Sequence, residues 1–398
     1  MKYIIAGNGV AGTTAAEHIR KNDPDGSITV VSDEAIPFYS RIRLIDFLAG
    51  DLTAEDLIIR DKEWYRENRI DLMLGTRVES IDTGEKEVAL SNYKKLVYDR
   101  LLLASGGIAF VPPAMGAQKK GVFTLRTIDD ARNIVEHVGN GNKRAVLIGG
   151  GVLGLEAGNS LLKAGCSVTV VEFFPRLLPR QMDSEGAEIL RAQMEKKGFS
   201  FHLGVSTEEI TGRESVDGIM LNNGIRIDCD MVLISAGVRP NTLLAGELNL
   251  TADKGLTVND RMETGISDIY AAGDLARHRG VFYGIWPAAE KQGEVAGINM
   301  AGGNAVYKGT TISNILKVAG VKFAAAGDID PDGKHEAIVL KDSNSFIYKK
   351  LVIDESKIIG AILYGDLKDM MKIFRTIEDK KNIENIRHQL EKWNLQYL

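Results

Sequence analysis

Two stretches of the chain share one order of apolar runs, glycine-rich turns and helical periodicity. Each begins with a short apolar run, continues through a turn and an amphipathic stretch, and returns to a β-rich run. The three segments are 2–6, 13–21 and 27–31 in the first copy and 144–148, 155–164 and 167–171 in the second. This pattern predicts strand, turn, helix and strand, twice, within about 30 residues each time.

The similarity between the two copies continues downstream. Residues 98–106 and 229–237 are both buried-strand patterns that end in small residues and glycine. Two related nucleotide-binding domains are therefore expected. Residues 121–126 are interpreted as the crossing into the second domain, and residues 237–241 as the return. The second domain, 119–237, is thus predicted to be inserted into the first, 1–118 and 238–305.

Residues 306–398 have a different pattern of apolar and polar positions from the rest of the chain. Apolar β-rich runs at 346–352 and 357–364 flank a polar turn, and helical patterns cover 367–376 and 382–393. We expect a small α+β C-terminal domain here. The predicted fold class is α/β, with two Rossmann-like three-layer dinucleotide-binding domains and this third domain.

Composition excludes several classes of function. Lys plus Arg is 49 and Asp plus Glu is 54, which gives a net charge of −5, so a general nucleic-acid binder is not expected. Two cysteines, Cys166 and Cys229, exclude a disulfide scaffold and a multi-cysteine metal site, and no metal centre is predicted. No apolar run reaches the roughly 18 residues of a membrane span, and residues 1–7 lack a signal-peptide pattern. We expect a cytoplasmic protein without membrane contact.

The turn in each copy is a Gly-x-Gly-x-x-Gly fingerprint. In the first, Gly7 allows the tight turn, Gly9 lets backbone amides approach a pyrophosphate, and Gly12 lets helix and strand pack closely. The helix N-terminus then faces the phosphates. Gly149, Gly151 and Gly154 repeat this spacing. The alternative, a structural turn without a ligand, is disfavoured by the strand before each turn and the helix after it.

An acid ends the second unit. Glu172 lies 18 residues past Gly154, where a carboxylate accepts hydrogen bonds from the adenosine ribose and repels a 2′-phosphate. This predicts NADH rather than NADPH, although Arg176 is near enough to offset the repulsion. A solvated acid at a strand end is the alternative.

The first unit has no acid in the matching position. Ser32 occupies it, so either Asp33 or Glu34 must take that role, and spacing does not choose between them. Two dinucleotide sites in one chain indicate FAD in one and NADH in the other.

A later segment, 264–274, ends in Gly273-Asp274, and here the chain resembles the pyridine nucleotide–disulphide oxidoreductase family. Five motifs stand in the family's order over roughly residues 1–305: the first fingerprint, Ala104-Ser105-Gly106, the second fingerprint, Gly237-x-Arg239-Pro240-Asn241 and Gly273-Asp274. The resemblance implies FAD in the first domain, NADH in the second, and Asp274 on the FAD ribityl chain.

The resemblance also assigns cofactor contacts. For FAD they are Gly7, Gly9, Gly12, Asp33, Glu34, Arg41, Arg43, Val78, Ala104, Ser105, Gly106, Arg126, Asp274, Trp286 and Pro287. For NAD they are Gly149, Gly151, Leu153, Gly154, Glu156, Glu172 and Gly237. Glu156 and Lys317 are candidates beside the flavin, and no catalytic side chain is assigned with certainty. The alternatives are exposed arginines at 41 and 43, a plain packing helix at 288–300 and a helix-terminal acid at 156.

Missing cysteines narrow the subfamily. Residues 37–46 contain none, whereas disulfide reductases of the family carry them there, and Cys166 and Cys229 are interpreted as buried packing residues. Segments 39–44, 178–183 and 315–320 resemble NADH:rubredoxin oxidoreductases and the flavin module of NADH-dependent nitrite reductases. Asp46 stands near the place where related ferredoxin reductases have a lysine beside the flavin.

These observations favour an NADH-dependent flavoprotein reductase. Hydride would pass from NADH to the flavin, and single electrons to an external acceptor such as rubredoxin or a similar small iron–sulfur carrier. Basic residues predicted to steer such a carrier are Arg277, His278, Arg279 and Lys317. The alternatives are an NADH oxidase using dioxygen, the flavin subunit of a nitrite reductase, and a redox-responsive NADH-binding protein. A homodimer is left open.

Overall fold

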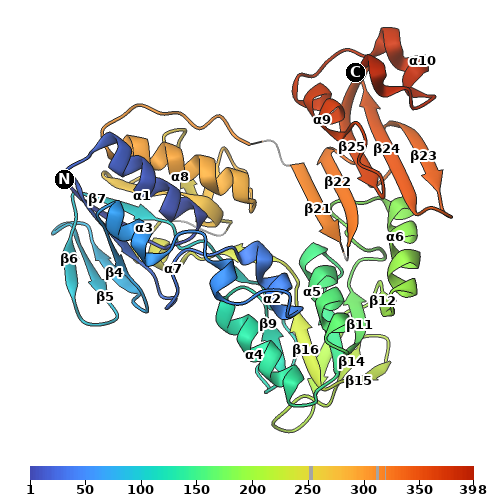
Figure 1. Ribbon diagram of the computed structural model, residues 1–398, viewed down its shortest axis with the longest axis horizontal. Coiled ribbons are helices and arrows are strands. Elements are labelled where there is room, and N and C mark those ends of the chain that lie inside the picture. The colour runs from blue at the N-terminus through green and yellow to red at the C-terminus, as the bar shows by residue number, and fades with distance from the viewer. Residues whose placement is uncertain (251–253, 311–312, 319) are drawn as a thin grey trace. The chain divides into compact units, whose positions relative to one another are not determined.

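The computed structural model describes residues 1–250, 254–310, 313–318 and 320–398. For residues 313–318 it describes the backbone alone. Contacts divide the chain into two compact units (Figure 1). Unit 1 comprises residues 1–43, 53–108 and 238–310, and unit 2 comprises residues 44–52, 109–237 and 311–398. The domain boundaries expected from sequence stay a prediction.

Unit 1 is built on a five-stranded parallel sheet in the order β19-β7-β1-β2-β3. The elements of this sheet and its helices are β1 (Lys2–Ala6), α1 (Val10–Asn22), β2 (Ser27–Val31), α3 (Lys62–Glu67), β3 (Ile70–Met73), β7 (Arg100–Leu103), β19 (Ile269–Ala271) and α8 (Trp286–Met300). Most residues of β1, β2, β7 and β19 are apolar and buried, as expected for strands of a parallel sheet.

Smaller elements complete unit 1. A three-stranded antiparallel sheet contains β4 (Val78–Asp82), β5 (Glu87–Leu90) and β6 (Lys95–Val97). The others are β8 (Gly107–Ala109), β17 (Val238–Pro240), α7 (Leu243–Glu247), β18 (Leu256–Val258) and β20 (Ala276–His278).

Helices α1 and α8 lie side by side (Figure 1). A Cβ added to Gly293 would lie 2.4 Å from the Ala11 carbonyl oxygen, and one added to Gly297 would lie 2.5 Å from that of Ala15. Glycine therefore permits this close approach of the two backbones. The predicted helix at 288–300 is confirmed.

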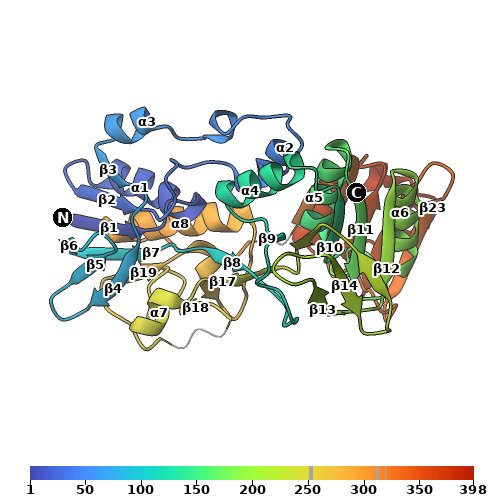
Figure 2. The ribbon, with the colours of Figure 1, turned by 90° about the horizontal axis from the view of Figure 1, so that it is seen from below.

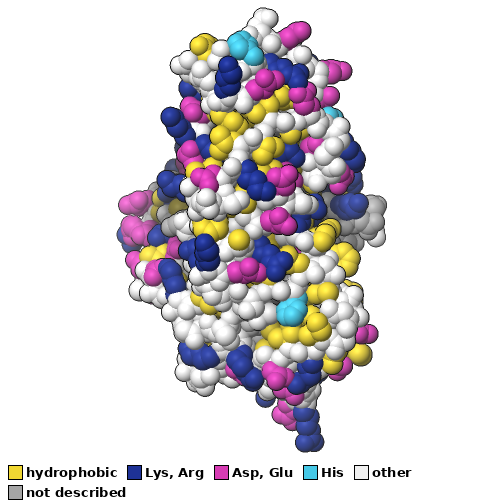
Figure 3. Space-filling view, turned by 90° about the vertical axis from the view of Figure 1, so that its right-hand side faces the viewer, with side chains coloured by type: hydrophobic (Ala, Val, Ile, Leu, Met, Phe, Trp, Pro, Cys, Tyr) yellow, Lys and Arg dark blue, Asp and Glu magenta, His cyan; other side chains and the backbone are white. Residues whose placement is uncertain are grey.

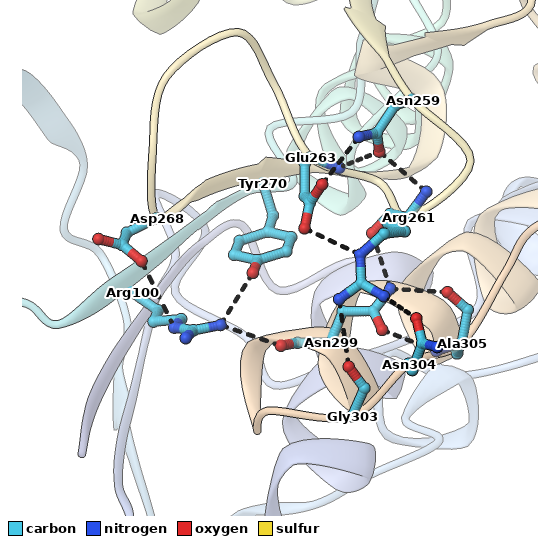
Figure 4. A network of polar contacts seen from close by, with 10 residues as sticks. All are labelled: Arg100, Asn259, Arg261, Glu263, Asp268, Tyr270, Asn299, Gly303, Asn304 and Ala305. Carbon is cyan, nitrogen blue, oxygen red and sulfur yellow. Dashed lines mark hydrogen bonds and ion pairs between the residues drawn. The ribbon is translucent and has the colours of Figure 1, made fainter.

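A polar network fixes the C-terminal end of α8 (Figure 4). The Arg100 guanidinium donates to the Tyr270 hydroxyl at 2.9 Å and to the Asn299 carbonyl at 3.0 Å. The Asn299 side chain in turn donates to the Arg261 and Ala305 carbonyls, each at 2.9 Å. These bonds tie the C-terminal end of α8 to β7 and β19, and so help to fix where the helix ends.

Unit 2 contains the second parallel sheet, in the order β12-β11-β10-β16-β9. Its elements are α2 (Leu44–Leu48), β9 (Val122–Thr124), α4 (Ile128–Gly139), β10 (Arg144–Ile148), α5 (Val152–Lys163), β11 (Ser167–Glu172), α6 (Ser184–Lys196), β12 (Phe199–Leu203) and β16 (Met231–Ile234). A second antiparallel sheet follows with β13 (Thr207–Thr211), β14 (Gly218–Leu221) and β15 (Arg226–Asp228). The two predicted Rossmann-like sheets are confirmed.

The C-terminal part of unit 2 is an antiparallel sheet in the order β21-β22-β25-β24-β23. Its elements are β21 (Ser313–Val318), β22 (Val321–Gly327), β23 (Glu336–Asp342), β24 (Ile347–Asp354), β25 (Lys357–Tyr364), α9 (Met370–Glu378) and α10 (Arg387–Leu390). The strands expected at 346–352 and 357–364 are β24 and β25.

The single helix predicted from sequence at 382–393 is wrong. Residues 382–393 form a 3₁₀ turn at Glu384–Ile386 and the single-turn helix α10 instead. The apolar residues of the pattern do pack on the core, but α10 ends at Leu390 and Trp393 has a left-handed φ of 52°. The helix expected at 367–376 begins later, at Met370, because Asp369 before it is left-handed with a φ of 65°.

The surface mixes charges of both signs. On the face drawn in Figure 3, Lys and Arg side chains alternate with Asp and Glu side chains. Among the described helices, none combines the length and apolarity that crossing a bilayer requires.

Candidate functional site

In the first fingerprint, two of the three glycines are required by the chain itself. Gly7 has a φ of 121°, and a Cβ on it would lie 2.2 Å from the Ala104 carbonyl oxygen. A Cβ on Gly12 would lie 2.0 Å from the Gly7 carbonyl oxygen. Gly9 differs, because its φ of −88° suits any residue and an added Cβ would meet no described atom within 4 Å.

The second fingerprint repeats this arrangement. Gly149 has a φ of 118° and its Cβ would lie 2.3 Å from the Ser235 carbonyl oxygen, while that of Gly154 would lie 2.2 Å from the Gly149 oxygen. Gly151 has a φ of −79° and open space around its Cβ position within the described part of the chain. In both units, therefore, the middle glycine faces open space among the described atoms.

The helices that follow both fingerprints begin in the same way. Neither α1 nor α5 has a side-chain cap or an acid in its first turn. By contrast, α4 begins with a capping box on Thr127, and α6 is capped by Asp183. Uncapped N–H groups and the positive end of the helix dipole form a binding site for phosphate. The two sites thus fit the pyrophosphates of two dinucleotides.

Glu172 lies at the end of β11 and its side chain is buried. Its Oε2 accepts the Gly150 N–H at 2.6 Å, and its Oε1 accepts the Phe174 N–H at 2.9 Å. The alternative of a solvated acid does not describe this environment. A carboxylate has about four acceptor sites, so two remain for ribose hydroxyls.

Arg176, expected as a cation that could offset Glu172, is bonded within its own loop. Its Nε donates to the Met182 carbonyl at 3.1 Å, and its Nη2 donates to the Pro179 carbonyl at 3.2 Å. These bonds direct part of the guanidinium to backbone oxygens rather than to a ligand.

Asp33 and Glu34, the two candidates for the acid of the first unit, occupy different environments. Asp33 is exposed. Glu34 is half-buried, accepts the Tyr39 hydroxyl at 2.6 Å and forms an ion pair with Arg41. Ser32 is buried at the strand end. Arg43 is exposed and donates to the Asp56 carbonyl at 3.2 Å.

Three groups of predicted FAD residues in unit 1 gather where strands of its parallel sheet end. Strands β1, β7 and β19 are neighbours in register at Ala6, Leu103 and Ala271. Their carboxyl ends therefore bring together Gly7, Ala104-Ser105-Gly106 and Gly273-Asp274. Val78 is buried at the start of β4.

Helix α8 supports this edge. Its residue Gln292 is buried and accepts the Gly273 N–H at 2.9 Å, which fixes the turn that carries Asp274. Trp286 and Pro287 begin the helix, and the Trp286 ring lies 5.8 Å from that of Phe38, centroid to centroid.

Sequence reasoning missed a polar group beside the first fingerprint. The Asn8 Oδ1 accepts the Tyr65 hydroxyl at 2.6 Å and the Thr13 hydroxyl at 3.2 Å. The Asn8 Nδ2 is buried without a partner among the described residues. An asparagine between two fingerprint glycines was the available signal, but its partner lies 57 residues away.

The remaining NAD candidates and Arg126 lie in unit 2. Leu153 and Glu156 are on α5, with Leu153 exposed and Glu156 half-buried, and Gly237 has a φ of 110° with open space around its Cβ position among described atoms. Arg126 is half-buried just before α4. The side chain of Lys317 lies outside the described residues.

One predicted steering residue is wrong. His278 is fully buried, with its Nε2 2.8 Å from Asp260 Oδ1, so it cannot contact a carrier protein. Arg279 is exposed but holds the same carboxylate through two hydrogen bonds. Arg277 donates to the Gly280 carbonyl at 3.1 Å.

Comparisons with known proteins cover almost the whole chain. Residues 1–293 match the family model of the pyridine nucleotide-disulphide oxidoreductases, and residues 313–381 match that of the rubredoxin NAD⁺ reductase C-terminal domain. A nitrite reductase [NAD(P)H] of Bacillus subtilis is 38% identical over 96% of this chain and 48% of its own length. The chain spans about half the length of the first curated relatives it matches.

Another relative matches over nearly the whole of both chains. The NADH-rubredoxin oxidoreductase of Clostridium acetobutylicum is 32% identical over 97% of this chain and 96% of its own. A crystal structure of the NADH:rubredoxin oxidoreductase from that organism superposes with a TM-score of 0.84 at 31% identity, covering 99% of both chains. These matches confirm the family and fold predicted from the sequence motifs. The chain belongs to the pyridine nucleotide-disulphide oxidoreductase family.

Proposed function

We propose that the chain is an NADH-dependent flavoprotein reductase that passes electrons to a small iron–sulfur carrier such as rubredoxin. FAD would bind at the first fingerprint in unit 1, and NADH at the second in unit 2. The observation that carries the proposal is the pair of open glycines, Gly9 and Gly151. Neither backbone conformation nor packing in the described chain requires glycine there, so a ligand that approaches the backbone accounts for both.

The residues of the chain bind and orient rather than react. The uncapped first turns of α1 and α5 would hold the two pyrophosphates, Asp274 the ribityl chain, and Glu172 the adenosine ribose of NADH. Bound FAD supplies the redox chemistry, because it accepts a hydride and releases electrons one at a time. The two cysteines are buried and unpaired, which supports transfer to an external acceptor without a thiol relay.

The names of relatives support the same activity. The Clostridium acetobutylicum protein, similar over 96% of its length, is an NADH-rubredoxin oxidoreductase. The Bacillus subtilis nitrite reductase, which the chain matches over about half its length, favours a second candidate. In that candidate the chain is the NADH-oxidising part of a nitrite-reducing system.

An anaerobic experiment tests the proposal. The purified, FAD-loaded protein is reduced with NADH and then mixed separately with oxidised rubredoxin, with ferredoxin and with air. Bleaching of the flavin by NADH, fast reoxidation by rubredoxin and slow reoxidation by air are expected. Fast reaction with air and none with either carrier would make it an oxidase. No reduction by NADH would overturn the proposal.

A further inference from the structure

The loop of residues 173–183 leads from Glu172 to α6 and contacts the second fingerprint on its way. The Leu178 N–H donates to the Gly150 carbonyl at 3.0 Å, and the N–H of the same glycine donates to Glu172. Leu178 is fully buried and has a φ of 48°, which is uncommon for a side chain of its size. Surrounding contacts must therefore hold the loop in this shape.

Asp183 ends the loop and is held by the C-terminal sheet. Its Oδ1 accepts the Gly186 N–H at 3.0 Å and so caps α6. Its Oδ2 accepts the Tyr348 hydroxyl at 2.6 Å and lies 3.0 Å from the Lys350 Nζ. The side chain of Lys350 is 6% exposed and that of Asp183 11%, so this ion pair is buried.

Packing around the pair leaves little freedom. A Cβ added to Gly186 would lie 2.8 Å from the Tyr348 ring, and the Lys350 Nζ also donates to the Asp330 carbonyl at 3.0 Å. Helix α6 lies beside the C-terminal sheet (Figure 2). Further along α6, Gln193 accepts the Tyr364 hydroxyl.

A buried ion pair is a poor source of net stability, since apolar residues of similar volume often serve as well. What it provides is geometry, because a carboxylate with three directed partners has one orientation. Here that orientation fixes the end of a loop whose other end is the acid expected to bind ribose.

We propose that Asp183, Tyr348 and Lys350 are positioning residues for the NADH site. By fixing the end of the 173–183 loop they hold Gly150 and Glu172 in place, so the C-terminal domain sets the affinity of this site and its preference for NADH. The inference rests on the proposed function, because it takes the second fingerprint as the NADH site.

The test uses the whole FAD-loaded chain with Tyr348→Phe and Lys350→Met. Lys349→Met is the matched control. Lys349 lies between Tyr348 and Lys350 in β24, is also buried, and forms an ion pair with Asp366 within the C-terminal domain. Binding of ADP-ribose is measured by calorimetry, and kcat and KM are measured with NADH and with NADPH.

Losing one directed contact is expected to weaken ADP-ribose binding and raise the KM for NADH about ten-fold. The kcat at saturating NADH and the FAD content should stay near wild type. The KM for NADPH should rise less than the KM for NADH. The control variant should match wild type. If Lys350→Met does not fold, Tyr348→Phe carries the test, since it keeps the ion pair.

Three results would overturn the inference. Folded variants that bind ADP-ribose within about two-fold of wild type would show that the loop does not need this anchor. An equal loss in Lys349→Met would show general loosening of the domain. A wild-type protein that binds neither ADP-ribose nor NADH would instead overturn the proposed function, and the inference with it.

Discussion

The Glu172 carboxylate accepts the Gly150 backbone N–H at 2.6 Å. This bond joins the acid that ends β11 to the glycine-rich turn that follows β10. The two residues are 22 positions apart but neighbours in space because β10 and β11 are parallel and in register. The residue expected to bind the ribose therefore also closes the turn expected to bind the pyrophosphate. Substitution of Glu172 should affect both.

We predict that Glu172→Gln weakens NADH binding and narrows the preference over NADPH. Both oxygens of Glu172 accept backbone N–H groups, so the amide must direct its NH₂ at one of these donors. Leaving that donor unsatisfied costs about 1–3 kcal/mol, while loss of the charge removes repulsion of a 2′-phosphate. The measurement is kcat/KM with each nucleotide.

Glu195→Gln is the control for this substitution, because Glu195 is an exposed acid on α6 that pairs with Arg191. This control substitution should leave kcat/KM unchanged with both NADH and NADPH. Unchanged kinetics in Glu172→Gln would show that the ribose assignment is wrong.

A second prediction separates glycines required by the fold from those required by the ligand. Gly7→Ala and Gly149→Ala should destabilise the protein by several kcal/mol, because their Cβ atoms would lie 2.2 and 2.3 Å from carbonyl oxygens. Gly9→Ala and Gly151→Ala should leave the Tm of the flavin-free protein unchanged, since neither meets a described atom within 4 Å.

Ligand binding should then distinguish the last two variants. Gly9→Ala should lower FAD content, whereas Gly151→Ala should keep FAD and raise the KM for NADH. Flavin absorbance and steady-state kinetics measure the two effects. Full retention of both ligands in both variants would remove the main support for the proposed function.

Elements with continuous apolar runs were predictable from sequence, and those without were not. Strands at 27–31 and 357–364 have the expected bounds, since most of their residues are buried. Strand β23 was missed because only Ile338 of its seven residues is buried, so no alternation marks it. At 382–393 the apolar spacing correctly marks residues that pack on the core, but the chain reaches them through short turns.

The residues of the candidate site were also predictable only in part. Spacing within one strand–turn–helix–strand unit leads to Gly151 and Glu172, because that unit has a fixed geometry. The contact of Asp183 with Tyr348 was not predictable, because the two residues are 165 positions apart and Tyr348 lies in the C-terminal sheet. Long-range polar pairs of this kind leave no periodic signal.

The cysteines give a third prediction, that Cys166→Ala with Cys229→Ala retains NADH-dependent reduction of the carrier. Burial raises the pKa of the Cys229 thiol to about 12 and also raises that of Cys166, so both stay protonated at neutral pH. A protonated, buried thiol is a poor nucleophile. Stopped-flow reduction of the double variant, compared with wild type, tests this.

Thiol labelling supplies the complementary measurement. Iodoacetamide should modify the native protein slowly and the unfolded protein rapidly at both positions. Loss of carrier reduction with the FAD content intact would instead indicate that a thiol takes part.

The last prediction concerns acid stability and Asp260. Hydrogen bonds from Arg279, and then from His278, hold the pKa of the Asp260 carboxyl well below its usual 3.8. A carboxyl with a lowered pKa in the folded state stabilises the protein above its unfolded pKa, and that contribution is lost as pH falls through the folded value. Wild type should therefore lose unfolding free energy below about pH 4 more steeply than Asp260→Asn. Denaturant unfolding at stepped pH values measures this, with Asp129→Asn, an exposed acid on α4, as the control expected to follow wild type. Parallel curves for wild type and Asp260→Asn would contradict the assignment of this acid dependence to Asp260.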